Sequence, residues 1–109
     1  MSMYGEYIAE RTGDQILEVE NGFATYRFPD EKTVYIVDIY IKPKSRNLHL
    51  ASDIADSIVK IAKGKGCIKL LGSVVPSARG STTSLRVLLG YGMTLDSSTQ
   101  DFVLFRKAI

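Results

Sequence analysis

The middle of the chain changes twice between strand-like and helix-like hydrophobic patterns, and this change constrains the fold more than any other feature. Residues Thr33 to Lys42 are mostly Val, Tyr and Ile interrupted by Asp38, a composition that predicts a strand buried on both faces. Apolar residues then recur at helical spacing from Leu50 to Ala62, and Cys67 to Val75 is a second apolar run. A strand, a helix and a strand in this order predict a right-handed parallel crossover, with Thr33–Lys42 at the centre of the sheet.

Shorter segments on either side extend this pattern. They are a helix at Tyr4–Arg11, a hairpin of strands Ile16–Glu20 and Phe23–Phe28 that Pro29-Asp30 ends, a loop at Pro76–Gly80, a helix at Ser81–Leu89, and strands at Gly92–Leu95 and Asp101–Lys107. We therefore expect a single α/β domain over residues 1–109, with a central mixed β-sheet and helices on both faces.

Charge and cysteine content exclude several classes of protein. The net charge is only +2, and nucleic-acid binding would require the basic residues of 42–46 and 60–69 to form one continuous face, so nucleic acid is not the expected partner. Cys67 is the single cysteine and cannot form an internal disulfide, and we expect no metal site. The chain shows neither an apolar signal core nor a membrane-length run, which predicts a cytoplasmic location.

A motif joins the central strand to the helix that follows it. The sequence Asp38-Ile39-Tyr40-Ile41-Lys42-Pro43 is followed by Arg46, His49 and Ala51 at fixed offsets, and Gly90-Tyr91 ends the later helix. In these features the chain resembles the GNAT superfamily of acyl-CoA-dependent N-acyltransferases from about Gly22 to the C-terminus. The resemblance implies a truncated GNAT-like fold, in which Tyr4–Arg11 is the remnant of a longer N-terminal portion that commonly lines the acceptor site.

The resemblance also implies acetyl-CoA as the cofactor. Its pantetheine arm would pair with backbone groups of Ile39 to Ile41, where the central strand diverges from the strand that begins at Cys67. The pyrophosphate would contact the amides at the start of the helix, with help from the charge of Arg46, Lys42 or Lys44. The residues implied for cofactor binding are Ile39, Ile41, Arg46, Asn47, Leu48, His49, Leu50, Ala51, Ser81 and Ser84, although Ser81 is equally explained as a helix N-cap.

His49 occupies a position where the family normally has glycine, because close approach of the backbone leaves no room for a side chain. Two interpretations remain open. The imidazole either blocks the pyrophosphate, which would make the loop a relic, or turns outward and leaves the amides usable.

The resemblance and the residue types together suggest three catalytic candidates. Asp38 lies in an apolar strand, where desolvation would suit it to act as a base, although pairing with a neighbouring arginine or capping of a backbone bulge explains it as well. Tyr40 shares the face of Asp38 and could reach the same cleft, or could be a core residue with its hydroxyl at the rim. Arg86 stands where the family often has a tyrosine that acts as the general acid. An arginine at this position could stabilise the leaving thiolate by its charge.

These observations support two functional hypotheses. The first is an N-acyltransferase that transfers an acetyl group to an amine acceptor with an altered cofactor loop. The second is a non-catalytic GNAT-like structural or interaction protein, for example one that is encoded by a bacteriophage or associated with a virion. A homo-oligomer such as a dimer, or a complex with another protein, is expected, since Asp101–Lys107 would be an edge strand unless it is paired or covered, and Phe102, Leu104 or Phe105 could extend an interface.

Overall fold

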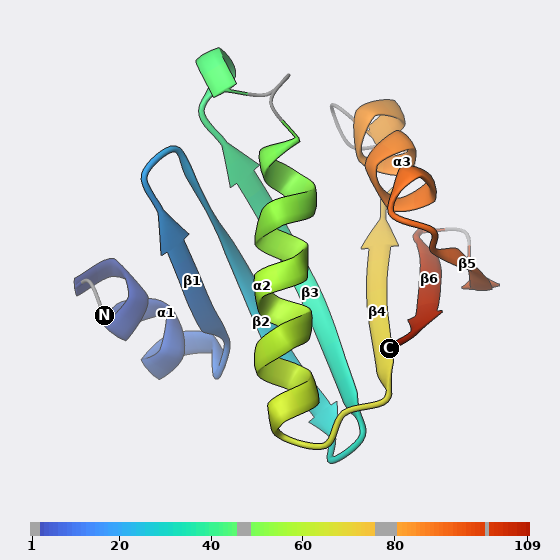
Figure 1. Ribbon diagram of the computed structural model, residues 1–109, viewed down its shortest axis with the longest axis horizontal. Coiled ribbons are helices and arrows are strands. Elements are labelled where there is room, and N and C mark those ends of the chain that lie inside the picture. Colours follow the sequence, from blue (N-terminus) through green and yellow to red (C-terminus); the bar gives the residue numbers. More distant parts are fainter. Residues whose placement is uncertain (1–2, 46–48, 76–80, 100) are drawn as a thin grey trace.

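The computed structural model describes residues 3–45, 49–75, 81–99 and 101–109. Its elements alternate along the chain much as the hydrophobic patterns predict (Figure 1). They are α1 (Met3–Thr12), β1 (Gln15–Val19), β2 (Gly22–Asp30), β3 (Thr33–Ile41), the short 3₁₀ helix η1 (Pro43–Ser45), α2 (Leu50–Gly64), β4 (Lys69–Val74), α3 (Ser81–Gly90), β5 (Thr94–Ser98) and β6 (Val103–Ala108).

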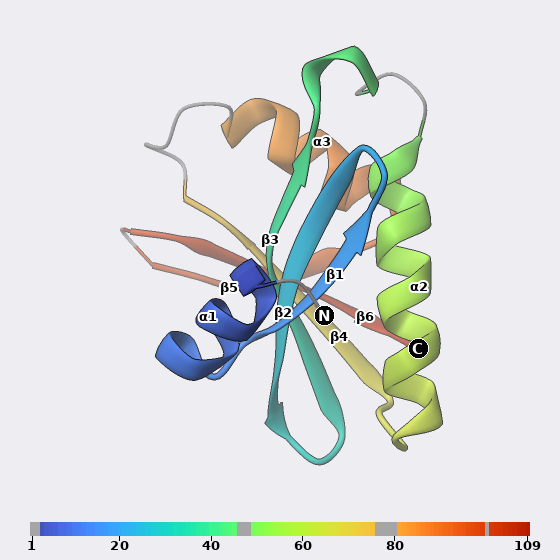
Figure 2. The same cartoon turned by 90° about the vertical axis from the view of Figure 1, so that its left-hand side faces the viewer.

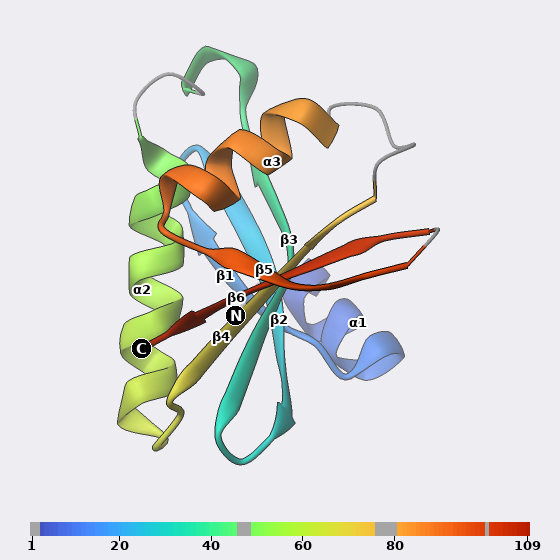
Figure 3. The same ribbon diagram turned by 90° about the vertical axis from the view of Figure 1, so that its right-hand side faces the viewer.

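The strands form one mixed sheet in the order β1-β2-β3-β4-β6-β5. Only β3 and β4 are parallel to each other among the described pairs, and α2 connects them. Helices α1 and α2 lie on opposite sides of the sheet (Figures 2 and 3). The expected mixed sheet with a strand-helix-strand crossover and helices on both faces is therefore confirmed.

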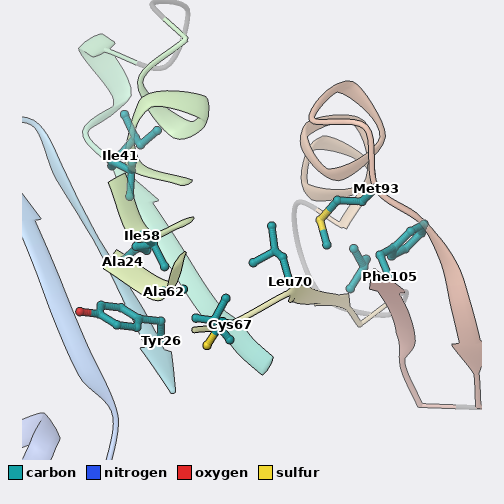
Figure 4. Packing of buried hydrophobic residues seen from close by; sticks show 12 residues of the cluster. Ala24, Tyr26, Ile41, Ile58, Ala62, Cys67, Leu70, Met93 and Phe105 are labelled. Atoms are coloured by element: carbon teal, nitrogen blue, oxygen red, sulfur yellow. The ribbon is translucent and has the colours of Figure 1, made fainter. Parts of the chain in front are cut away.

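The core lies between α2 and the sheet because α2 has a continuous apolar side. Ile54 and Ile58 of α2 are almost completely buried, as are Val34 of β3 and Leu70 of β4. Burial of each such side chain contributes about 1.5–3 kcal/mol to folding. Figure 4 shows Leu70 between Ile41 and Ile58 on one side and Met93 and Phe105 on the other, so the core continues past β4 to the last strands.

The β1–β2 hairpin depends on a glycine at its turn. Gly22 pairs with Ile41 of β3, and a Cβ atom at this position would overlap the carbonyl oxygen of Tyr40. A side chain here would push β2 away from β3 near the carboxyl end of β3. Glycine thus permits the close contact between the two strands.

Several expectations are wrong in detail. The central strand is not buried on both faces, because Asp38 and Tyr40 are exposed on the face opposite α2. Strand β2 includes Pro29 and ends at Asp30, two residues beyond its predicted end at Phe28. The predicted strand Cys67–Val75 begins only at Lys69, with Cys67 buried just before it.

The last strand was expected at an edge unless another strand paired with it, and β5 does pair with it. Strand β6 lies between β4 and β5, and Phe105 is buried in the core, so this strand offers no free edge for an oligomer. The edges of the described sheet are β1 and β5. Among the described helices, none combines the length and the apolar character that crossing a membrane requires.

Candidate functional site

The parallel strands β3 and β4 are paired along only part of their length. Their register runs from Thr33 opposite Lys69 to Ile36 opposite Gly72, and then stops, although β3 continues to Ile41. The two strands diverge toward their carboxyl ends (Figure 1). Ligands of open α/β sheets commonly bind at such carboxyl ends, so this divergence is the first candidate for a site.

A β-bulge explains why β3 leaves β4 at this point. Tyr26 of β2 pairs with Ile36 and Thr25 pairs with Asp38, so Val37 is an extra residue without a partner on β2. A bulge bends its strand and increases the local twist. Because Val37 directly follows the last residue that pairs with β4, the bend turns the rest of β3 away from β4.

Beyond the bulge, the backbone of β3 presents polar groups to the opening. The Lys42 amide donates a hydrogen bond to the Asn21 carbonyl with an N···O distance of 2.8 Å. Since antiparallel pairs alternate between bonded and non-bonded positions, the backbone groups of Tyr40 face β2 and those of Ile39 and Ile41 point toward the side that β4 has left. Ile39 can therefore offer an N–H and a C=O to an extended, amide-containing ligand.

Side chains from two helices close the opening into a cleft of about 570 Å³, which we call the β3–β4 cleft. Its walls are residues 36–41 of β3, residues 70–73 of β4, Ala51, Ser52 and Ala55 of α2, and Val87, Leu88, Tyr91 and Met93 in and after α3. The small residues on α2 leave the space that larger side chains would fill. An apolar slot with backbone polar groups on one wall suits a narrow, flexible chain.

Two of the predicted catalytic residues lie in this wall on the sheet face that carries α1. Asp38 and Tyr40 both line the β3–β4 cleft and both have exposed side chains. The expected desolvation of Asp38 is therefore wrong, because its side chain points away from the core that α2 covers. Pairing of Asp38 with an arginine is also absent within the described part of the chain, where Arg27 instead binds Asp14 with an Nε–Oδ1 distance of 2.6 Å.

A hydrogen bond marks the point where the two strands separate. The Tyr35 hydroxyl and the Ser73 Oγ are 2.6 Å apart, joining β3 to β4 across the end of their paired region. Ser73 also lines the cleft. The pair fixes where the opening begins, and the sequence could not reveal it because the two residues are 38 positions apart.

The helix N-terminus at the open end of the cleft begins with an unusual backbone. His49 is the N-cap of α2 and has φ 57° and ψ 22°, the left-handed conformation that favours glycine. Its carbonyl accepts the first helical hydrogen bond from the Asp53 amide, while its exposed side chain makes no capping hydrogen bond. The backbone at position 49 thus keeps a glycine-like shape although the residue is histidine.

A tyrosine at the other end of the cleft ties the two helices together. The Tyr91 hydroxyl donates to Asp56 Oδ1 of α2 at 2.5 Å, and Lys107 Nζ donates to the Tyr91 carbonyl at 2.8 Å. Burial, followed by the hydrogen bond and charge of Asp56, raises the pKa of Tyr91 well above its usual range. The ammonium of Lys107 also lies 4.4 Å from the centre of the Tyr91 ring. Sequence analysis did not identify Asp56, whose position on the polar side of α2 gave no sign of this contact.

Only some of the remaining predicted residues lie at the site. Leu50 and Ala51 lie in the first turn of α2, whereas Arg46, Asn47 and Leu48 fall outside the described residues. Ser81 and Ser84 belong to the first turn of α3, and their side chains are likewise not described. Arg86 is exposed on α3 and does not line the cleft. No three described His, Cys, Asp or Glu side chains are grouped so that they could hold a metal ion.

Comparison with known proteins gives the same architecture. The chain is similar to a GNAT family acetyltransferase from Elizabethkingia anophelis with acetyl-CoA bound, with a TM-score of 0.76, 18% identity, and coverage of 95% of this chain and 82% of that one. It is also similar to the PaiA N-acetyltransferase from Thermoplasma acidophilum in complex with coenzyme A, with a TM-score of 0.77, 15% identity, and coverage of 98% and 69%. A third similar structure is Ard1 from Thermoplasma volcanium, with a TM-score of 0.74, 9% identity, and coverage of 95% and 76%.

At such low identity these structures establish the fold alone. A search of curated proteins finds no significant match. The sequence model of the acetyltransferase (GNAT) family, however, matches residues 7–82, which include the motif and the helix that follows it. Because this match spans well over half of the chain, the chain belongs to the acetyltransferase (GNAT) family.

Proposed function

We propose that the protein binds acetyl-CoA in the β3–β4 cleft and transfers its acetyl group to an amine. The observation that carries this proposal is the divergence of β3 from β4, which directs the backbone groups of Ile39 toward a narrow slot. The pantetheine arm contains two amide groups in a thin, flexible chain. Its chemistry fits a slot that has apolar walls and one polar backbone edge.

The open end of the cleft supports the same cofactor. The first turn of α2 presents the amides of Leu50 and Ala51 at the positive end of the helix dipole, and Lys42 and Lys44 are exposed nearby in the chain. A pyrophosphate suits this environment. The glycine-like backbone and exposed side chain of His49 favour the interpretation in which the imidazole turns outward and leaves these amides usable.

When bound, acetyl-CoA supplies an activated thioester, whose C–S bond breaks as the amine nitrogen forms the new C–N bond. Asp38 takes the proton that the attacking amine loses, because it is a carboxylate in the wall of the cleft on the accessible α1 face. Tyr40 lies on the same face and donates a proton to the leaving thiolate. Arg86 receives no part in this scheme because it lies outside the lining of the cleft.

Binding can be tested by isothermal titration with acetyl-CoA. Ser52→Phe places a ring in the wall of the cleft and should abolish the heat of binding, whereas Ser57→Phe adds the same ring to an exposed position of α2 that does not line it. We expect wild-type protein and Ser57→Phe to bind alike. If wild-type protein gives neither heat nor a thermal shift at millimolar acetyl-CoA, the proposal is wrong and the non-catalytic alternative is favoured.

Transfer is tested separately, by following release of free CoA thiol with an amine acceptor present. Asp38→Asn should lower kcat and leave the dissociation constant of acetyl-CoA unchanged, since Asp38 acts on the acceptor. Loss of cofactor binding in this variant would show that Asp38 serves the cleft structure instead. Binding without any acetyl transfer to a broad panel of primary amines would remove the catalytic part of the proposal.

A further inference from the structure

The β3–β4 cleft lies between two helices that come from different parts of the chain. One side is lined by residues of α2, and the other by residues in and after α3, namely Val87, Leu88, Tyr91 and Met93. Figure 1 shows α2 over β3 and α3 over the carboxyl end of β4. The separation of these two helices therefore determines the width of the cleft.

The described side chains of α3 provide little packing that would fix its position. Leu85, Val87 and Leu89 are exposed, whereas Leu88 packs against the core. The contacts of α3 with other elements are mainly with β4, where Gly72 makes room for it, since a Cβ atom there would lie 3.0 Å from Leu88 Cδ2. A ten-residue helix with so little buried surface is not held rigidly by packing alone.

A hydrogen bond joins the end of α3 to α2. The Tyr91 amide donates to the Val87 carbonyl at 3.0 Å, which fixes Tyr91 to the last turn of α3. The Tyr91 hydroxyl in turn donates to Asp56 of α2, and Lys107 of β6 donates to the Tyr91 carbonyl. Among the described residues, no other hydrogen bond or ion pair joins α2 to α3 or to the turn after it.

Tyr91 reaches from one wall of the cleft to the other. It lines the cleft itself, and its hydroxyl binds the residue that directly follows Ala55 in the opposite wall. Asp56 is exposed and does not line the cleft, so it acts through Tyr91 and not on a ligand. Because the phenol ring is rigid, the hydrogen bond holds the two walls at one separation.

We infer that Tyr91 and Asp56 are positioning residues, whose hydrogen bond holds α3 at the distance from α2 that fits the cofactor. The inference rests on the proposed function, which places the pantetheine arm in this cleft. A cleft that is already held at its bound width loses less conformational freedom when the ligand enters. Breaking the bond should therefore weaken acetyl-CoA binding and leave the chemical step at saturation unchanged.

Exchange of backbone amide hydrogens, followed by NMR without cofactor, tests whether the bond holds α3. Tyr91→Phe removes the donor hydroxyl and Asp56→Ala removes the acceptor. In both variants we expect the amides of residues 85–90 to exchange about 5-fold faster, the effect of losing one hydrogen bond. Val59→Ala is the control, because Val59 packs against the core without lining the cleft, so this variant lowers the overall stability. It should leave the exchange of residues 85–90 unchanged.

Binding and transfer are measured with the same variants. The dissociation constant of acetyl-CoA should rise about 5-fold for Tyr91→Phe and Asp56→Ala, with kcat at saturating acetyl-CoA within about twofold of wild type. Asp56→Asn keeps an oxygen that accepts a hydrogen bond, so its dissociation constant should stay within about twofold of wild type. An equal rise for Val59→Ala, or a lower kcat with an unchanged dissociation constant in Tyr91→Phe, would overturn the inference.

The proposed function and the positioning role fail separately. If wild-type protein does not bind acetyl-CoA, the proposed function fails, while exchange measured without cofactor still shows whether the hydrogen bond holds α3. If wild-type protein and Tyr91→Phe bind acetyl-CoA equally well, only the positioning role is overturned. Equal exchange of residues 85–90 in Tyr91→Phe and wild type would also overturn it.

Discussion

Replacement of His49 with glycine should stabilise the protein, although it removes a whole side chain. His49 has φ 57° and ψ 22° at the N-cap of α2, and its side chain makes no capping hydrogen bond that would be lost. The left-handed conformation costs a residue with a Cβ atom roughly 1–2 kcal/mol. Glycine avoids that cost, but its greater conformational entropy stabilises the unfolded chain by about 0.5–1 kcal/mol. The difference predicts a net gain of about 0.5–1 kcal/mol in the free energy of unfolding.

Urea and thermal unfolding followed by circular dichroism measure this gain. For a domain of this size we expect the Tm to rise by about 2–6 °C. His49→Ala is the matched control, because it also removes the imidazole but keeps the Cβ atom and therefore the strain. It should be no more stable than wild type.

The reasoning is refuted if His49→Gly is less stable than wild type, or if His49→Ala gains as much as His49→Gly. The same variants also decide between the two interpretations of the histidine. With the side chain exposed, as in this structure, both variants should bind acetyl-CoA within about twofold of wild type. A tenfold gain for both, equivalent to about 1.4 kcal/mol, would instead mean that the imidazole obstructs the cofactor.

Three further substitutions test the framework around the cleft. Gly22→Ala should lower the free energy of unfolding by roughly 1–3 kcal/mol in urea, because its Cβ overlaps the Tyr40 carbonyl, whereas Gly64→Ala, with nothing within 4 Å, should not destabilise. Tyr91→Phe should lose about 1 kcal/mol at pH 7. The pKa of Tyr91 is raised in the folded state, so its contribution to wild-type stability is fully present below the ordinary pKa of 10.0 and declines above it. Urea unfolding at different pH values should therefore show that the free energy of unfolding falls less for Tyr91→Phe than for wild type between pH 9 and 11. Asp14→Ala should cost about 1 kcal/mol by breaking the ion pair with Arg27, and Arg27→Ala should add little to that loss in a double-mutant cycle.

The crossover at the centre of the fold was predictable because its pattern is local. The apolar residues of α2 recur on one side of a helix, and the two flanking apolar runs are long enough to be strands. The ends of these elements are set by nearby residues. For example, α2 ends at Gly64, next to Gly66. The family motif, which spans only Asp38 to Ala51, was recognisable for the same reason.

The errors arose where distant segments decide the outcome. Whether β6 lies at an edge depends on which strands pair, and its place between β4 and β5 involves partners far apart in the chain. The burial of Asp38 was misjudged because an apolar strand composition reveals neither the bulge at Val37, which sets the face of Asp38, nor the end of the β3–β4 pairing at Ile36 and Gly72. Contacts such as Tyr91 with Asp56 join residues 35 positions apart, and one sequence alone gives no indication of them.

The extra residue Val37 also changes which alternate residues of β3 face α2. Before it, even-numbered residues such as Val34 and Ile36 face α2, and after it the odd-numbered Ile39 and Ile41 do so. Without this one-residue offset, regular alternation would turn Asp38 and Tyr40 into the core and Ile39 into water. Deletion of Val37 would remove the bulge and leave the same residues on each face of a regular strand, but it would also remove the bend that turns β3 away from β4. The length of this segment is therefore as strict a requirement for the site as the identity of its side chains.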